Sequence, residues 1–394
     1  MIERIKQIAA TNLPETIAIR RHLHAHPELS FEETKTSAYI CSQLDALGIA
    51  YTKGYVNTGI VAHIYGKAPE SKVVALRGDM DALPITEQNT AAYCSQNSGV
   101  MHACGHDVHT ACLLGAGRIL NALKEEFSGT IKLVFQPGEE KLPGGASLMI
   151  KAGALESPKA SAIFGQHVAP DLEVGKVGFR AGMYMASTDE LYFTVHGKGG
   201  HAALPHTLID PVLITAHIIT ALQQIVSRRC KPGVPSVLSF GKVIANGATN
   251  IIPDKVEVEG TFRTMNEEWR AEAHLIMIEV AENIAKSMGG TCEFRVERGY
   301  PFLVNDEPLT LLAIDAARNY LGTANVVDLE MRMTAEDFSY YSQLMPACFY
   351  RLGTRNESKG ITSGVHTSTF DVDETSLEIG SGLMAYLAIR QLES

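Results

Sequence analysis

Short apolar runs alternate with longer amphipathic stretches along most of the chain, a pattern typical of strands that alternate with helices. The predicted buried strands are 73–76, 130–135, 162–164 and 346–352. The predicted helices are 2–24, 32–47 and 108–123. Ser30 and Glu33 are expected to form a capping box at the start of the second helix, and Gly48 is expected to end it. The alternation predicts an α/β fold with a sheet covered by helices.

The middle of the chain has a different order of elements. Its predicted strands are 190–196, 236–244, 255–263 and 291–296. Its predicted helices are 210–228, which begins at Asp210-Pro211, and 267–287. The order β-α-β-β-α-β predicts a ferredoxin-like unit inserted into the larger fold between Gly182 and Gly299. We therefore expect one α/β domain formed by 1–185 and 299–394, interrupted by an inserted domain at 186–298.

The composition narrows the class of protein. A chain of 394 residues exceeds what one hydrophobic core normally supports, which favours two domains. Its 45% apolar and 20% charged residues are typical of soluble globular proteins. The net charge of −10 argues against nucleic acid or an anionic membrane as a partner. Seven cysteines without framework spacing, and an N-terminus without an uninterrupted apolar stretch, favour a cytoplasmic protein with free thiols.

The densest chemistry lies at His102–His109, where five of the eight side chains are able to bind a metal. Alone, Cys104 would more often be a small buried thiol, and His106 a buried histidine with ordinary hydrogen bonds. Together at the start of a predicted helix they indicate metal ligation. Imidazole and thiolate suit zinc, with manganese or cobalt as alternatives. We expect His102 and His109 to orient the ligands by hydrogen bonds, since not all of these groups fit one site.

Two adjacent carboxylates, Glu139 and Glu140, follow a predicted strand after a Pro-Gly bend. An isolated pair would normally be a solvated surface feature, but the position at a strand end favours a function. One is expected to bind metal, and the other to move protons between water and a leaving nitrogen. Asp79, Asp81 and His167 also follow predicted strands, and open α/β sheets bind ligands outside the carboxyl ends of their strands.

For several other polar residues, the spacing along the chain does not decide between a functional and a structural role. His167 is equally consistent with a ligand and with a structural histidine, and His366 in a late loop would more often lie on the surface. The Gly-rich segment His196–His206 carries three histidines, but it lacks the spacing of a phosphate-binding loop. Asn250 is a polar residue in an otherwise apolar segment. Arg263 is either a bidentate clamp for a carboxylate or a surface arginine.

Taken together, these motifs resemble the aminoacylase/carboxypeptidase metallohydrolase family, in the subgroup of hippurate hydrolase and indole-acetyl-amino-acid hydrolase. The resemblance runs over nearly the whole chain. It rests on Arg20-Arg-His-Leu-His-Ala-His-Pro-Glu-Leu-Ser30, Arg77-Gly-Asp-Met-Asp-Ala-Leu-Pro84, Met101-His-Ala-Cys-Gly-His-Asp107, Gln136-Pro-Gly-Glu-Glu140, Gly199-Gly-His-Ala-Ala203, Asn250-Ile-Ile-Pro253 and Glu336-Asp-Phe338.

The resemblance implies a role for each matching residue. The implied ligands of a two-cation site are Cys104, His106, Glu140, His167 and His366. Glu139 is implied to be the general base and acid, and His201 to steady the oxyanion, often across a dimer. Asn250 and Arg263 are implied to hold the substrate backbone and its carboxylate. The two cations are expected to be zinc, with manganese, cobalt or nickel as alternatives.

The resemblance also implies a fold, and the sequence departs from the subgroup at two places, Gly138 and the residues after His366. The implied fold is a catalytic domain of the di-metal aminopeptidase type, a central mixed sheet with helices on both faces, plus an inserted lid and dimerisation domain. Asp79-Met-Asp81 stands where the wider family has His-x-Asp, as in the subgroup. Gly138 stands where the subgroup usually has Ala. His366 is followed by Thr and Ser, where the subgroup commonly has His-Pro or Ser-Pro.

We therefore expect a cytoplasmic homodimeric amidohydrolase that cleaves N-acyl amino acids to a carboxylic acid and a free amino acid, without a nucleic-acid or membrane partner. A metallocarboxypeptidase or dipeptidase, or an N-acetyl-diaminopimelate deacetylase, is the alternative within the class. A non-catalytic metal-binding or dimerisation protein is the alternative outside it. A site lacking one ligand or Glu139 would favour that alternative, and none is missing.

Overall fold

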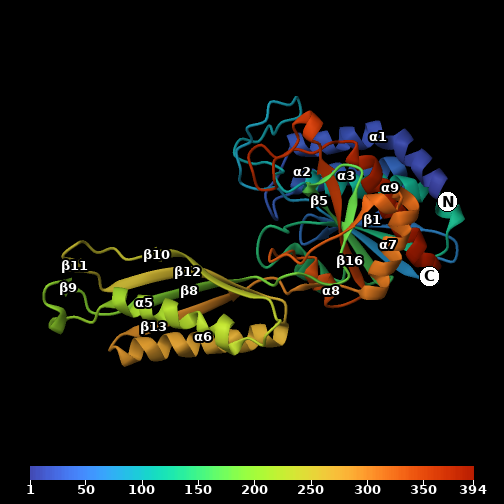
Figure 1. Cartoon of the computed structure of the whole chain (residues 1–394). Coiled ribbons are helices and arrows are strands. Elements are labelled where there is room, and N and C mark those ends of the chain that lie inside the picture. The colour runs from blue at the N-terminus through green and yellow to red at the C-terminus, as the bar shows by residue number, and fades with distance from the viewer. The chain divides into compact units, whose positions relative to one another are not determined.

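The computed structural model describes the whole chain, Met1 to Ser394, as two compact units. The larger unit consists of Met1–Tyr184, Val304–Glu330 and Asp337–Ser394. The smaller unit consists of Met185–Leu303 and Met331–Glu336. Within the smaller unit, the N–H of Ala186 donates to the carbonyls of Arg332 and Thr334, which joins its two pieces. Each unit has its own sheet and its own hydrophobic core (Figure 1).

The larger unit is built on a mixed eight-stranded sheet in the order β1-β2-β4-β3-β5-β16-β6-β15. Its strands are β1 (Ala50–Tyr55), β2 (Gly59–Tyr65), β3 (Val73–Asp79), β4 (Thr130–Gln136), β5 (Ala162–Glu173), β6 (Val177–Phe179), β15 (Val326–Asp328) and β16 (Ala347–Arg355). Strands β4, β3, β5 and β16 run parallel in the centre, whereas β2 and β6 are antiparallel to their central neighbours. The central strands are buried on both faces, which explains the uninterrupted apolar runs that predicted them.

Helices cover both faces of this sheet. They are α1 (Ile2–Ala25), α2 (Thr34–Leu47), α3 (His106–Ala122), α4 (Gly145–Lys151), α7 (Glu307–Leu321), α8 (Ser339–Ser342) and α9 (Ser376–Glu393). Successive residues of a strand point to opposite faces. On β4, Leu133 packs in the core beside Gly117 of α3, whereas Lys132 donates to the carbonyl of Ala154, just beyond α4. No helix combines the length and the apolar character that crossing a bilayer would require.

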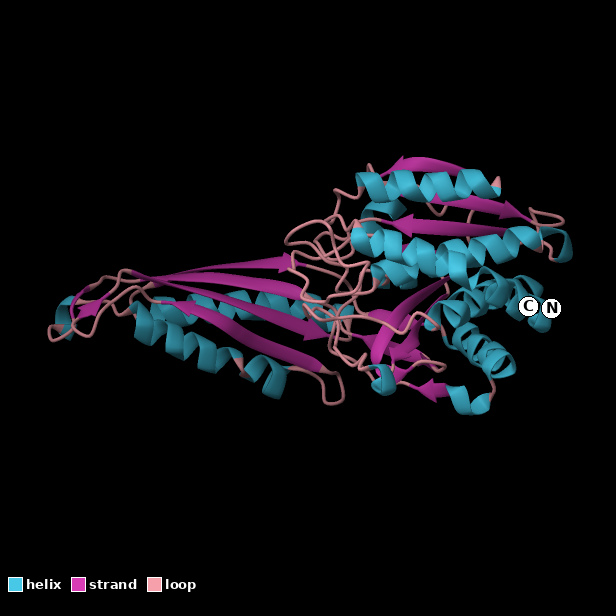
Figure 2. Cartoon of the chain, turned by 90° about the horizontal axis from the view of Figure 1, so that it is seen from above, coloured by secondary structure: helices cyan, strands magenta, loops and turns pink.

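The smaller unit is a four-stranded antiparallel sheet in the order β10-β12-β8-β13, with two long helices along it (Figure 2). Its elements are β8 (Asp189–His196), α5 (Pro211–Leu222), β10 (Ser236–Ile244), β12 (Lys255–Thr264), α6 (Glu267–Ser287) and β13 (Thr291–Arg298), plus a small pair of strands, β9 (Gly200–His201) and β11 (Ile251–Ile252). The carboxylate of Asp210 accepts two N–H groups of the first turn of α5, as the sequence predicted. The β-α-β-β-α-β order of the ferredoxin-like unit is confirmed.

The predicted capping box of α2 is wrong. Ser30 donates to a carboxylate oxygen of Asp81 at 2.6 Å, and Glu33 accepts the N–H of Gly138 at 2.9 Å. The helix is capped instead by Glu28, whose carboxylate accepts two N–H groups of the first turn. Tertiary partners thus take both side chains that the local pattern assigns to the helix, whereas Gly48 ends α2 in the left-handed conformation as expected, with φ 63°.

Candidate active site

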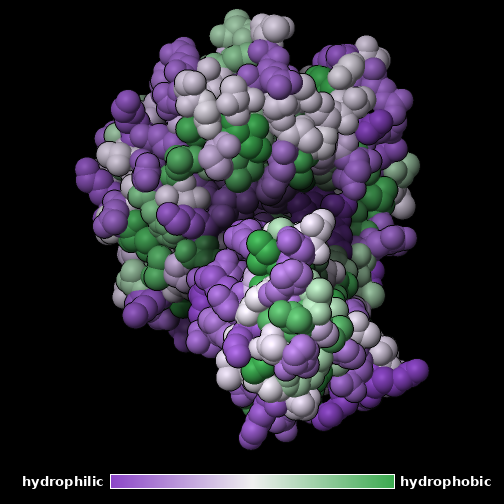
Figure 3. All heavy atoms as spheres, turned by 90° about the vertical axis from the view of Figure 1, so that its left-hand side faces the viewer, coloured by the Kyte–Doolittle hydropathy of each residue, from purple (hydrophilic) through white to green (hydrophobic).

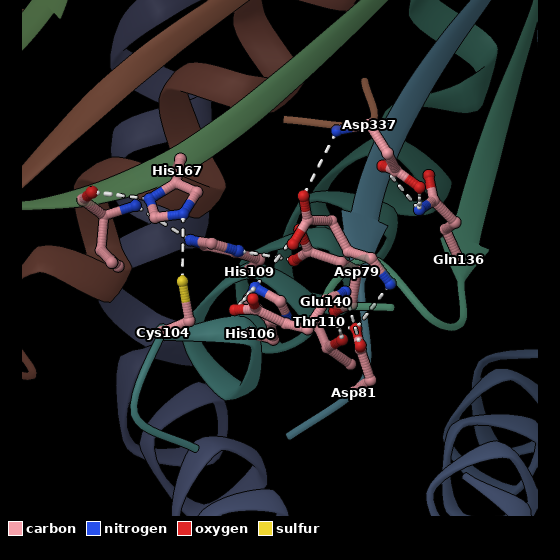
Figure 4. Close-up of polar contacts among 12 residues, drawn as sticks. Asp79, Asp81, Cys104, His106, His109, Thr110, Gln136, Glu140, His167 and Asp337 are labelled. Atoms are coloured by element: carbon pink, nitrogen blue, oxygen red, sulfur yellow. Dashed lines mark hydrogen bonds and ion pairs between the residues drawn. The ribbon is translucent and has the colours of Figure 1, made fainter. Parts of the chain in front are cut away.

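The predicted metal ligands lie together in the larger unit, at the carboxyl end of its central strands. Figure 4 shows four of them, Cys104, His106, Glu140 and His167. The sulfur of Cys104 is 3.5 Å from Nε2 of His167 and 3.3 Å from Nε2 of His366. Oε1 of Glu140 is 3.2 Å from Nε2 of His366 and 3.8 Å from Nε2 of His106. Five side chains from distant parts of the sequence therefore present ligand atoms to one small volume.

The start of α3 places Cys104 and His106. The helix begins at His106, and Gly105 before it has φ 83°, in the left-handed region. A Cβ at Gly105 would lie 2.6 Å from the side chain of Val168, so only glycine allows the ligand loop to approach β5 this closely. The helix N-terminus beside Cys104 favours negative charge on its sulfur.

Two histidines are fixed through one ring nitrogen and leave the other for a ligand. Nδ1 of His167 donates to the carbonyl of Val168 at 2.8 Å, which leaves Nε2 facing Cys104. Nδ1 of His106 lies 3.2 Å from Oδ1 of Asp81, and its buried Nε2 has no hydrogen-bond partner. A buried nitrogen without a partner is costly, and a cation at this point would satisfy it. His167 lies inside β5 rather than after it, because the strand continues beyond the predicted 162–164.

Asp81 organises the loop that carries the two glutamates. Its buried carboxylate accepts the backbone N–H of Glu139 at 3.1 Å and of Glu140 at 3.0 Å. Burial alone would raise the pKa of Asp81, but hydrogen bonds, first from His106 and then from Ser30, hold it below its ordinary value. The ionised carboxylate therefore fixes the bend after β4, and both glutamate side chains project from this bend.

His109 and His102 differ from one another. His109 lies between Oδ1 of Asp79, at 2.6 Å from its Nδ1, and the N–H of Val168, which donates to its Nε2 at 2.9 Å. Both of its nitrogens are engaged, so it links the start of α3 to β5 and is not free to bind metal. For His102 the prediction is wrong: it is buried, neither ring nitrogen has a hydrogen-bond partner, and burial lowers its pKa to about 4.

His366 reaches the cluster from a strained loop. Its φ is 61°, a conformation uncommon outside glycine, and its N–H donates to the carbonyl of Ala103 at 2.7 Å. Strained residues of this kind gather at functional sites, where the surrounding structure imposes the conformation. The hydrogen bond beside Cys104 thus ties the last loop to the first ligand motif. The geometry supports His366 as a ligand despite the altered residues that follow it.

The charges of the cluster fit divalent cations. Burial, followed by the carboxylate of Glu140, raises the pKa of the Cys104 thiol well above its ordinary value. The thiol becomes a thiolate here only when positive charge is added, which is what a bound cation supplies. Three sets that contain predicted ligands have ligand atoms within 4.8 Å of one another: Cys104 with His106 and His167, Cys104 with Glu140 and His366, and His106 with Glu139 and Glu140. Two further sets meet the same distance, Asp79 with His106 and His109, and Glu139 with Glu336 and Asp337. The donor set of sulfur, imidazole and carboxylate suits borderline metals.

The remaining predicted site residues, His201, Asn250 and Arg263, belong to the smaller unit. There His201 and Asn250 are neighbours, whereas Arg263 lies far from both. The backbone of His201 pairs with Ile251, and the carbonyl of Asn250 accepts the N–H of Ala202, so His201 and Asn250 are neighbours. Arg263 is half-buried near the far end of β12. His196, just before the His201 loop, pairs with the first residue of β12, and that strand extends about 27 Å to Arg263 at roughly 3.4 Å per residue.

The sequence pattern assigns no role to Arg77 or Asp337, although both lie in motifs of the resemblance. Both are fully buried, and Nη2 of Arg77 donates to Oδ1 of Asp337 at 2.7 Å. The N–H of Asp337 donates to Oε1 of Glu139 at 3.2 Å. For Arg77 the sequence carries one signal, a charged residue within an apolar strand. Nothing in the neighbouring sequence identifies Asp337 as its partner.

Comparisons with known proteins find relatives and solved structures that this chain resembles over most of its length. The family model for peptidase family M20/M25/M40 matches residues 75–390. The thermostable carboxypeptidase 2 of Saccharolobus solfataricus is 39% identical over 394 residues, covering 99% of this chain and 98% of that protein. An N-acyl-L-amino acid amidohydrolase of Geobacillus stearothermophilus is 42% identical over 303 residues, covering 77% and 81%. The solved structure of a dinuclear metal-binding peptidase of the M20 family from Bacillus subtilis has a TM-score of 0.84 at 36% identity, covering 98% and 99%.

Replacement of Cys104 by serine should weaken metal binding, because a hydroxyl is a far poorer ligand than a thiolate for borderline cations. The measurement is metal content after dialysis against limiting zinc, together with the far-ultraviolet circular dichroism of the same sample. Cys112→Ser is the matched control, since Cys112 is likewise a buried cysteine, on α3, but lies outside every ligand set. Full zinc content in the Cys104 variant would exclude it as a ligand.

Proposed function

This chain belongs to peptidase family M20/M25/M40, and from that membership and the geometry of the ligand cluster we propose that it hydrolyses N-acyl amino acids to a carboxylic acid and a free amino acid. The observation that carries the proposal is the convergence of five ligand side chains beside Glu139, which is only 7% exposed. The 42% identical N-acyl-L-amino acid amidohydrolase supports the substrate class.

Two divalent cations, zinc first, with manganese, cobalt or nickel as alternatives, fit these residues. Their proposed ligands are Cys104, His106, Glu140, His167 and His366. When bound, the cations would supply Lewis acidity toward the amide carbonyl and toward water. The sets overlap, since Cys104 is in two of them and His106 in three, which supports a pair of adjacent ions rather than a single one.

Glu139 is the proposed proton carrier. Its carboxylate accepts a proton from the water that attacks the acyl carbon, and the new C–O bond forms as that proton leaves. The same proton then passes from Glu139 to the amide nitrogen, the C–N bond breaks, and the amino acid departs as a neutral amine. His201 donates a hydrogen bond to the oxyanion of the tetrahedral intermediate, and Arg263 pairs with the substrate carboxylate.

We propose a homodimer in which His201 and Asn250 serve the partner's active site. The smaller unit supports this proposal, because its His201 and Arg263 lie at opposite ends of β12, too far apart for one small substrate to contact both. Its sheet also ends in the open edge strand β10, where Val237 and Val243 are 36% and 52% exposed. Figure 3 shows hydrophobic residues among polar ones on the end of this unit that faces the viewer.

The cytoplasm is the proposed compartment, and the seven free cysteines support it. A dipeptide-cleaving carboxypeptidase is the second candidate function, favoured by the 39% identity to a thermostable carboxypeptidase over 99% of the chain.

A panel of N-acetyl, N-benzoyl and indole-acetyl amino acids beside C-terminally free dipeptides tests the proposed substrate class. We expect the highest kcat/KM on an N-acyl amino acid, and loss of all turnover in a chelator with recovery on adding zinc or manganese. Higher kcat/KM on dipeptides throughout the panel would favour the carboxypeptidase. Hydrolysis that persists after complete metal removal would contradict both candidates.

The variant Glu139→Gln should lose at least about 10²–10⁴-fold in kcat, because glutamine keeps the shape of the side chain but cannot accept the proton. Its metal content should match that of the wild type, since Glu139 is not among the proposed ligands. Kinetics and elemental analysis on the same preparation decide the matter. Substantial residual turnover, or loss of cations, would assign proton transfer to another residue.

Mixed dimers test the action of His201 across subunits. His201→Ala and Glu139→Gln, each nearly inactive alone, should regain up to about a quarter of wild-type activity after random subunit exchange, since about half of the pairs are mixed and each holds one intact composite site. The proportion of mixed dimers is measured with one tagged variant. Mixed dimers that form and stay inactive would show that His201 does not serve the partner.

A further inference from the structure

Asp337 is a fully buried carboxylate that the proposed mechanism does not use. Its Oδ1 accepts Nη2 of Arg77 at 2.7 Å and Nε2 of Gln136 at 2.9 Å. Its Oδ2 accepts Nε2 of Gln136 at 2.8 Å and the N–H of Ala146 at 2.9 Å. The donors come from β3 near its carboxyl end, from the last residue of β4 and from the first turn of α4. The side chain of Asp337 is therefore immobilised on both oxygens.

The backbone of the same residue contacts the proposed proton carrier. The N–H of Asp337 donates to Oε1 of Glu139 at 3.2 Å, as the dashed line from the labelled Asp337 nitrogen shows (Figure 4). The N–H of Glu139 is in turn bound to Asp81 at 3.1 Å. Glu139 is thus fixed at its backbone by one buried aspartate and at its carboxylate by the backbone of another.

We propose that Asp337 is a positioning residue for proton transfer by Glu139. The inference rests on the proposed function and adds to it. The direction of the Asp337 N–H depends on the path of the chain at this residue, and the four hydrogen bonds of the side chain set that path. Displacement of a reacting group by about 1 Å is able to cost on the order of 10²-fold in rate. The carboxylate of Asp337 therefore acts on catalysis through Glu139 without touching the substrate.

A purely structural role is the competing explanation, because Arg77 is a buried cation that needs anionic partners. Arg77 keeps a second one, since its Nη1 donates to Oδ2 of Asp79 at 2.6 Å. The change Asp337→Asn preserves the volume and one acceptor oxygen. It also replaces an acceptor by a donor that faces N–H groups, so the segment should shift without leaving Arg77 alone.

The test measures kcat, KM, bound metal and thermal unfolding of Asp337→Asn. We expect kcat to fall about 10–100-fold with KM and metal content within about twofold of the wild type, since only the placement of Glu139 changes. Asp373→Asn is the matched control: Asp373 is 2% exposed and also accepts several hydrogen bonds, including the N–H of Thr375, but it does not contact Glu139. It should lower the unfolding temperature and leave kcat within about twofold.

A double mutant separates this inference from the proposed function. In the Glu139→Gln background, Asp337→Asn should cause no further loss of kcat, because the group that it positions is already inactive. Multiplied losses, or a kcat within twofold of wild type for the single variant, would overturn the positioning role. An active Glu139→Gln enzyme would instead overturn the proposed function.

If Asp337→Asn does not fold, a second variant tests the same proposal. Gln136→Met removes the Nε2 donor that binds both oxygens of Asp337, and also the Oε1 acceptor of Arg77 Nε and Tyr341 OH, but it keeps the charge pair of Arg77 with Asp337. It is expected to lower kcat about 3–10-fold at unchanged KM, because Asp337 keeps Arg77 and the N–H of Ala146 as donors and is displaced less than in Asp337→Asn. An unchanged kcat in this variant would contradict the proposal.

Discussion

The burial of one arginine is the constraint on which the architecture of the active site depends. Arg77 is fully buried in the central strand β3, where a cation is stable only if anionic or polar acceptors surround it. Its three donor nitrogens reach Gln136, Asp79 and Asp337 at 2.6–2.9 Å. The ends of two strands and a segment from the last third of the chain therefore meet at one point. Asp79 extends the network to His109 and from there to β5.

This network explains why polar atoms of the ligand cluster lack hydrogen-bond partners outside the cluster. The fixed carboxylates of Asp79 and Asp81 are satisfied by arginine, histidine, serine and backbone donors, which holds the pKa of each below its ordinary value despite burial. Among the ligand atoms, Nε2 of His106 has no hydrogen-bond partner, and the sulfur of Cys104 contacts Nε2 of two other ligands, His167 and His366. The hydrogen-bond donors around the site thus bind the supporting carboxylates of Asp79 and Asp81, and the ligand atoms remain available to cations.

Much of the fold could be predicted from the sequence, because buried parallel strands and amphipathic helices leave distinct periodic patterns. The strand 236–244 and the helix 267–287 agree with the structure to the residue. Prediction failed where long-range partners override local chemistry. Ser30 and Glu33 have the spacing of a capping box but bind Asp81 and the loop after β4. The polar residues inside β5 made that strand look shorter than it is.

The candidate site shows the same limit. The ligand types were predictable from the motif and the resemblance, and the structure brings these residues together. The role of Asp337 was not, because its contact with Glu139 joins residues 198 positions apart. The separation of His201 from Arg263 also depends on the register of β12 against β8, which no local pattern fixes.

Diffraction from crystals grown with zinc, recorded at the zinc absorption edge, tests whether the cluster holds two cations. Two anomalous peaks about 3.5–4 Å apart are expected. Together their coordination spheres should take in Cys104, His106, Glu140, His167 and His366 at about 2.0–2.3 Å. A single peak, or peaks that Asp79 and His109 coordinate in place of these side chains, would contradict this expectation.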